Sequence, residues 1–157
     1  DSHVGAFAVI GVVALLLLKW TALVGLPLDI RVGALVLFPC LSRWGILMVM
    51  DRYRYARTQG MGTSFQQGRM RKQMALGFVT ALVASLLLAG VAGILLLATA
   101  TAVAWGLGHW MAGLLGGLTG DTYGAVNEVA EVAVLLVAVA IATAAPSIVG
   151  WPLPWRG

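Results

Sequence analysis

The residues best suited to chemistry lie in one segment, residues 117–131, which reads Gly-Leu-Thr-Gly-Asp-Thr-Tyr-Gly-Ala-Val-Asn-Glu-Val-Ala-Glu. This segment holds three of the six acidic residues of the chain and opens an apolar stretch with the length of a helix. At about 100° per residue, Glu128 and Glu131 lie roughly 20° and 80° from Asp121 around such a helix. Gly124 falls between them, so we expect three carboxylates on one sterically open side.

Carboxylate oxygens suit Mg²⁺, which proteins usually hold with one or two carboxylates together with phosphate oxygens of a substrate. We therefore assign Asp121 and Glu128 to a candidate catalytic and metal site. Two alternatives stay open at this point. Asp121 and Thr119 can serve only to cap the helix. Glu128 and Glu131 can instead pair with Arg residues on neighbouring helices, because a carboxylate inside a membrane helix is costly.

A basic segment forms the second candidate site. Seven of the ten Lys and Arg residues lie between residues 43 and 72. Arg54 and Arg57 alternate with Tyr, a pattern able to bind phosphates and to stack on a base. Arg43 lies about two turns inside the preceding apolar stretch, roughly 10 Å deep, where an Arg is a functional candidate. The alternatives are lipid contact for the loop and snorkelling for Arg43.

The first residues, Asp-Ser-His-Val-Gly, offer a third candidate pair, because Asp1 and His3 together can do acid–base or metal chemistry. The chain opens with no Met, no basic region and no cleavage pattern, so we interpret it as a piece of a longer protein, not as a signal peptide. It has no Gly-x-Ser-x-Gly, Walker A or His-Glu-x-x-His motif, which leaves hydrolase and ATPase functions unsupported.

These candidate residues sit in a chain with the composition of a membrane protein. Of its 157 residues, 61% are hydrophobic and 10% are charged, whereas a soluble domain carries about 25% charged residues. A single cysteine, Cys40, forms no intrachain disulfide. We therefore exclude a soluble enzyme, a secreted disulfide module and a disordered chain. We predict an all-α integral membrane protein, a polytopic helical bundle in which residues 1–157 form a single transmembrane domain.

The apolar stretches predict about five transmembrane helices, drawn from residues 7–26, 30–50, 74–105 and 122–144. One crossing needs only about 20 residues, so residues 74–105 form either one long tilted helix or two short helices that meet at residues 89–93. We favour the hairpin. Lys19 interrupts the first stretch near its far end, and we interpret it as a side chain that snorkels to the interface.

The basic segment at about residues 51–73 is predicted to be a cytoplasmic loop, because Lys and Arg accumulate on that side of membrane proteins. The same bias explains the net charge of +4, so a nucleic-acid partner is not needed to account for it. Counted from this loop, the five spans bring residues 1–5, 43–65 and 118–131 to the cytoplasmic side. We thus expect the lipid bilayer and no nucleic acid as partners, and the sequence is compatible with a homo-oligomer.

Taken together, the three polar segments resemble the C-terminal part of the cobalamin synthase family, the adenosylcobinamide-GDP ribazoletransferases. The resemblance rests on three motifs in order. The first is Asp-Ser-His-Val-Gly-Ala-Phe before an apolar helix with Lys-Trp, the second is Arg-Tyr-Ala-Arg-x-x-Gly-Met-Gly, and the third is Gly-Leu-Thr-Gly-Asp-Thr-Tyr-Gly-Ala-x-x-Glu. The resemblance covers nearly the whole chain, and Thr-Gly-Asp-Thr-x-Gly-Ala-x-x-Glu is its most specific part.

The resemblance implies a multi-pass transferase of the cell inner membrane, with its active-site face in the cytoplasm, that acts in the last steps of cobalamin (vitamin B12) biosynthesis. The family joins adenosylcobinamide-GDP to α-ribazole, or to its 5′-phosphate, with release of GMP, and it uses Mg²⁺. The acids of the metal or phosphate site would then be Asp121, Glu128 and Asp1. The contacts to substrate and phosphate would be His3, Arg43, Arg54, Arg57 and Thr119.

One departure from the family bears on activity. The family has an acidic Asp-Gly-x-x-Asp-type motif upstream of the Asp-Ser-His segment, and this chain begins after it. We therefore expect the 157-residue piece alone to be inactive. The alternative function is a membrane transporter or channel subunit without catalytic activity, in which Arg43, Glu128 and Glu131 line an ion path. A transporter needs such charges near the membrane midplane, whereas the motifs here lie toward one face.

Overall fold

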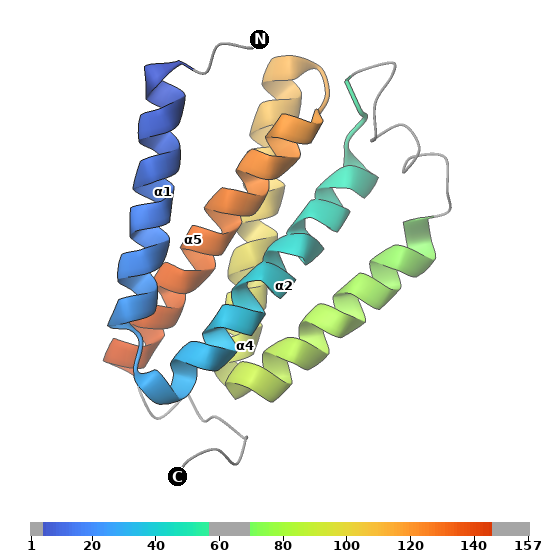
Figure 1. The fold of residues 1–157 in the computed structure, drawn as a ribbon. Helices are drawn as coiled ribbons and strands as arrows, with labels where there is room; N and C mark the ends of the chain where they lie inside the picture. The colour runs from blue at the N-terminus through green and yellow to red at the C-terminus, as the bar shows by residue number, and fades with distance from the viewer. Residues whose placement is uncertain (1–4, 57–69, 146–157) are drawn as a thin grey trace.

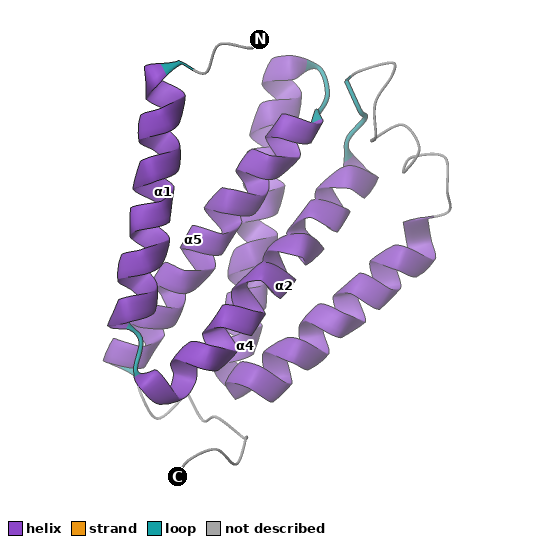
Figure 2. Ribbon diagram, viewed as in Figure 1, coloured by secondary structure: helices purple, strands orange, loops and turns teal. Residues whose placement is uncertain are grey.

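The structure is a computed structural model that describes residues 5–56 and 70–145. In these residues it contains four α-helices and no β-strand (Figures 1 and 2). The helices are α1 (Ala6–Gly25), α2 (Leu28–Arg52), α4 (Met70–Leu115) and α5 (Gly120–Ala144). All four are long and apolar enough to cross a membrane. The predicted all-α, multi-pass membrane fold is therefore confirmed.

The predicted number of about five transmembrane helices is wrong, because the described residues contain four. The difference lies in α4, which continues for 46 residues with no loop between its two halves. It is broken at a single residue, Gly90, whose φ of 54° and ψ of −134° lie outside the helical region and favour glycine.

The break at Gly90 folds the two halves of α4 back toward each other, as the V shape in Figure 1 shows. A Cβ at Gly93 would overlap the backbone carbonyl of Ser85. In an unbroken helix, residues eight positions apart are about 12 Å from each other, so this contact requires a sharp turn. The turn lies within residues 89–93, where the sequence placed it.

Several helix termini lie at one end of the bundle, which we call the polar end (Figure 1). The first turn of α1, the last turn of α2 and the first turn of α5 lie there. The opposite end, which we call the far end, holds the junction of α1 with α2, the break in α4 and the last turn of α5. α5 packs against α1, α2 and α4, and α1 packs mainly against α5.

The core lies among α2, α4 and α5, where Leu37, Leu41, Leu97 and Val134 are buried together. Trp44 of α2 closes this core and donates a hydrogen bond of 3.0 Å from Nε1 to the Thr101 hydroxyl of α4. Large apolar side chains cover the outside of the bundle, which is the surface that a bilayer would solvate.

α1 is the least packed helix. Residues 5–14 are all exposed, and Ala22 is the buried residue of the helix. Its C-terminal end is held by Arg31 of α2, whose Nη2 donates to the carbonyl oxygens of Val24 and Leu26 at 2.9 Å each. These bonds satisfy carbonyls that a helix end leaves without partners. α1 is thus anchored at the far end and stands clear of α5 toward the polar end.

Candidate active site

The start of α5 is fixed by a capping box. The Thr119 hydroxyl accepts from the backbone N–H of Thr122 at 3.5 Å, and the Thr122 hydroxyl accepts from the backbone N–H of Thr119 at 2.8 Å. Asp121 lies in the first turn and is exposed, where the helix dipole favours a negative charge. Thr119 therefore caps the helix, as one alternative predicted, and its role as a phosphate contact stays a prediction.

The basic segment after α2 is joined to the segment before α5. Tyr55 and Leu118 form a parallel bridge, in which Leu118 N–H donates to the Arg54 carbonyl at 2.9 Å and Ala56 N–H donates to the Leu118 carbonyl at 2.8 Å. The rings of Tyr55 and Tyr123 stack with centroids 6.4 Å apart. These contacts place Arg54, which is exposed, beside the first turn of α5.

The side of α5 that carries Asp121, Gly124 and Glu128 is open, and we call it the open acidic face. No heavy atom lies within 4 Å of the position that a Cβ would take at Gly120 or Gly124. The Glu128 side chain is 42% exposed. The expected open side is therefore present at Asp121, Gly124 and Glu128, but Glu131, which was expected on the same open side, is buried.

A complete metal site is not present among the described residues, because they contain no group of three His, Cys, Asp or Glu side chains able to hold an ion. Asp121 and Glu128 are seven residues apart, so their Cα atoms are separated by roughly 10 Å along the helix. The other predicted metal ligand, Asp1, and the predicted contacts His3 and Arg57 lie outside the described residues.

A polar network joins three helices below the open acidic face. Lys19 of α1 donates to Glu128 Oε2 and to Glu131 Oε2, at 2.6 Å in each case. Lys19 and Glu131 have side chains only 14% and 8% exposed. The interpretation of Lys19 as a snorkelling residue is therefore wrong: two carboxylates of α5 are close enough to neutralise it inside the bundle, so it does not need the interface.

α2 completes this network. Ser42 donates to Glu131 Oε1 at 3.0 Å, and Asn127 Nδ2 donates to the same oxygen at 2.9 Å. Arg43 Nη1 in turn donates to Asn127 Oδ1 at 3.1 Å. Arg43 is thus linked to the acids through Asn127. We call the whole set of Lys19, Ser42, Arg43, Asn127, Glu128 and Glu131 the buried polar network, after its buried members Ser42, Asn127 and Glu131; Arg43 is exposed and Glu128 is partly exposed.

Among these residues the sequence did not predict the ion pairs of Lys19 or the contact of Ser42 with Glu131. The signal was present, because a Lys in one apolar stretch and two Glu in another must find partners inside a membrane. The alternative that Glu128 and Glu131 pair with Arg residues of neighbouring helices was right that they form ion pairs across helices but wrong about the residue. The cation is Lys19, and no described Arg forms an ion pair with either acid.

The fold and the site define a class: a multi-pass, all-α membrane protein with an acidic helix terminus joined to a basic segment at one end of the bundle. The profile of the cobalamin-5-phosphate synthase family matches residues 1–139. The chain belongs to this family.

Several curated relatives carry the name adenosylcobinamide-GDP ribazoletransferase. The protein of Desulforamulus reducens is 37% identical over 132 residues, which cover 83% of this chain and 53% of the relative. That of Roseiflexus sp. is 39% identical over 135 residues, with coverage of 86% and 50%. That of Desulfitobacterium hafniense is 42% identical over 149 residues, with coverage of 87% and 56%. The chain spans about half the length of the curated relatives it matches. No solved structure matches it.

Proposed function

We propose that this chain is part of an adenosylcobinamide-GDP ribazoletransferase. The reaction joins adenosylcobinamide-GDP to α-ribazole, or to its 5′-phosphate, and releases GMP in the last steps of cobalamin biosynthesis. The observation that carries the proposal is the bridge between Tyr55 and Leu118, which holds the basic segment against the acidic start of α5. Family membership and the names of the relatives support the same reaction.

The residues at the polar end fit the demands of this transfer. A diphosphate must have its charge neutralised, and the acceptor hydroxyl must be held in line with the bond that breaks. Arg54 and Arg57 neutralise phosphate oxygens, because a guanidinium matches their geometry. The acceptor oxygen bonds to the phosphorus on the cobinamide side, GMP leaves with the electrons of the broken bond, and a carboxylate of the site accepts the hydroxyl proton.

Mg²⁺ fits the donors of the open acidic face. Asp121 and Glu128 carry hard oxygen ligands, and no neighbouring atom lies within 4 Å of the Cβ positions at Gly120 and Gly124 on the same side of α5. These two residues would hold the ion together with phosphate oxygens of the substrate. When bound, Mg²⁺ supplies positive charge to the diphosphate in the transition state.

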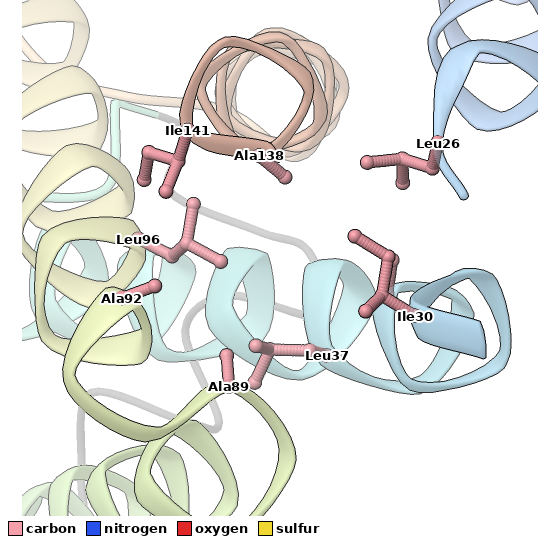
Figure 3. A pocket seen from close by; sticks show the side chains of 9 residues that line it. Leu26, Ile30, Leu37, Ala89, Ala92, Leu96, Ala138 and Ile141 are labelled. Atoms are coloured by element: carbon pink, nitrogen blue, oxygen red, sulfur yellow. The ribbon is translucent and has the colours of Figure 1, made fainter. Parts of the chain in front are cut away.

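The transporter alternative receives less support from the interior of the bundle. Toward the far end the core is formed mainly by apolar side chains, while Ser85 is buried near the break in α4 and Asp29 and Arg31 lie at the start of α2. A cavity of about 30 Å³ there is lined only by apolar side chains, among them Leu26, Ile30, Leu37 and Ile141 (Figure 3). An ion path needs polar groups on both sides of its central site, and this half of the bundle offers none among the lining residues.

We further propose that the protein is a multi-pass protein of the cell inner membrane with its polar end in the cytoplasm. The basic segment begins at that end, where Arg52 and Arg54 are exposed. Lys and Arg concentrate in cytoplasmic loops, so this orientation places the acids and the phosphate contacts on the side that holds nucleotide substrates.

The proposed reaction is tested with membranes that carry the full-length parent protein. They receive adenosylcobinamide-GDP, α-ribazole and Mg²⁺, and GMP release is followed by chromatography. We expect release that requires all three additions. Well-inserted protein that releases no GMP would contradict the proposed reaction and favour the transporter alternative.

A further inference from the structure

Glu131 is the centre of the buried polar network, and both of its carboxylate oxygens already accept hydrogen bonds. Its Oε2 accepts from Lys19 at 2.6 Å, and its Oε1 accepts from Asn127 at 2.9 Å and lies 3.0 Å from the Ser42 hydroxyl. The side chain is 8% exposed. A carboxylate with three donors in so buried a place serves to organise its neighbours.

Glu128 differs from Glu131 in access. It shares Lys19 with Glu131, since Lys19 Nζ lies 2.6 Å from an oxygen of each acid. Its Oε1 meets only the Asn127 amide at 3.4 Å, a long contact. With 42% of the side chain exposed, Glu128 presents its remaining lone pairs to the open acidic face.

Asn127 is itself oriented from α2. Arg43 donates to its Oδ1, which turns the amide nitrogen toward both acids. The network contains two cationic and two anionic side chains, and of the cations only Lys19 forms ion pairs with Glu128 and Glu131. The network thus contains one exposed carboxylate supported by buried groups from α1, α2 and α5.

We propose that Lys19 and Glu131 are positioning residues, which fix the Glu128 carboxylate on the open acidic face where it ligates Mg²⁺. The inference rests on the proposed function, and it adds the residues that hold one Mg²⁺ ligand, the Glu128 carboxylate, in place. Groups that hydrogen-bond to a ligating carboxylate typically change metal affinity by about 10- to 100-fold when they are removed.

A purely structural role must be distinguished from this one, because Lys19 also ties the loosely packed α1 to α5. The single change Lys19→Met leaves two carboxylates of one helix face to repel each other, so it can unfold the protein. The double change Lys19→Met with Glu131→Gln removes one positive and one negative charge together. The double variant keeps the net charge and the Glu128 carboxylate. Any remaining loss of Mn²⁺ affinity therefore reports on the orientation of that carboxylate.

The experiment uses the purified full-length parent protein in four further forms: Lys19→Met, Lys19→Arg, the double variant, and Asp29→Asn as a charge-removing control. Asp29 is exposed in the first turn of α2 at the far end and lies outside the network. Thermal unfolding, the affinity for Mn²⁺ measured by electron paramagnetic resonance, and the Mg²⁺ requirement of GMP release are compared.

We expect the double variant to unfold near the wild-type temperature, to bind Mn²⁺ about 10- to 100-fold more weakly and to need correspondingly more Mg²⁺. Lys19→Arg should restore most of the affinity, and Asp29→Asn should match the wild type. A double variant that keeps both the wild-type unfolding temperature and the wild-type Mn²⁺ affinity would overturn the positioning role, as would wild-type protein that binds no Mn²⁺. Absent GMP release with normal Mn²⁺ binding would count against the proposed function alone.

Discussion

Gly117 and Arg54 are in such close contact that a Cβ at residue 117 would lie 2.8 Å from the Arg54 carbonyl oxygen. The same carbonyl accepts the backbone N–H of Leu118. Two segments that are far apart in the sequence are thus held together through backbone atoms, and the contact admits only a residue without a side chain. This contact sets the position of the basic segment relative to the acids of α5.

The change Gly117→Ala should separate the two segments. We expect GMP release by the full-length protein to fall by about 10- to 100-fold, because a displacement near 1 Å can misalign reacting groups by that much. The matched control is Gly113→Ala, since Gly113 has no heavy atom within 4 Å of its Cβ position. Equal activity of both variants would show that the close approach is not needed.

The turn within α4 should depend on Gly93. A Cβ there would overlap backbone atoms of Ser85, which cannot move without shifting the helix. We expect Gly93→Ala to lower the free energy of unfolding by about 1–3 kcal/mol, measured by thermal or denaturant unfolding in detergent. Gly106→Ala on the same helix meets no neighbour and should be neutral or slightly stabilising. The prediction fails if the two variants are equally stable.

The apolar cavity at the far end should accept a larger side chain. Ala138 of α5 lines this cavity of about 30 Å³ (Figure 3), so Ala138→Val fills part of it. We expect a gain of about 0.5–1 kcal/mol in stability, since cavity filling commonly stabilises by this amount. Ala140→Val, on the exposed side of the same helix, provides the control. A lower unfolding temperature for Ala138→Val alone would mean that the cavity is too tight for the extra carbon atoms.

Much of the fold followed from the sequence for simple physical reasons. Apolar length defines membrane helices, and the clustering of Lys and Arg around residues 43–72 identified the loop that meets the start of α5. The capping role of Thr119 was recognisable because Thr precedes an acidic first turn. The helix count failed at Gly90, where one residue turns the chain without the loop that normally separates two spans.

The candidate site was predicted less completely. The face shared by Asp121 and Glu128 followed from helix periodicity, which is a local property. The partner of Glu128 and Glu131 was missed because Lys19 lies more than 100 residues away in the chain. Its distance from the acids depends on how α1 packs against α5, which neither periodicity nor composition determines. The sequence did contain a signal, because the apolar stretch with Lys19 and the apolar stretch with Glu128 and Glu131 each carry charge that needs a partner inside a membrane.

The central claim is that the acid at the start of α5 takes part in the transfer of the nucleotide. The most direct measurement compares GMP release by membranes carrying full-length wild type, Asp121→Asn and Asp29→Asn, each checked for insertion. Asp29 is an exposed acid in the first turn of α2 at the far end, so it controls for the loss of a charged helix start. We predict Mg²⁺-dependent release by wild type and Asp29→Asn, and a loss of about 100-fold or more for Asp121→Asn. Full activity of a well-inserted Asp121→Asn protein would contradict the claim.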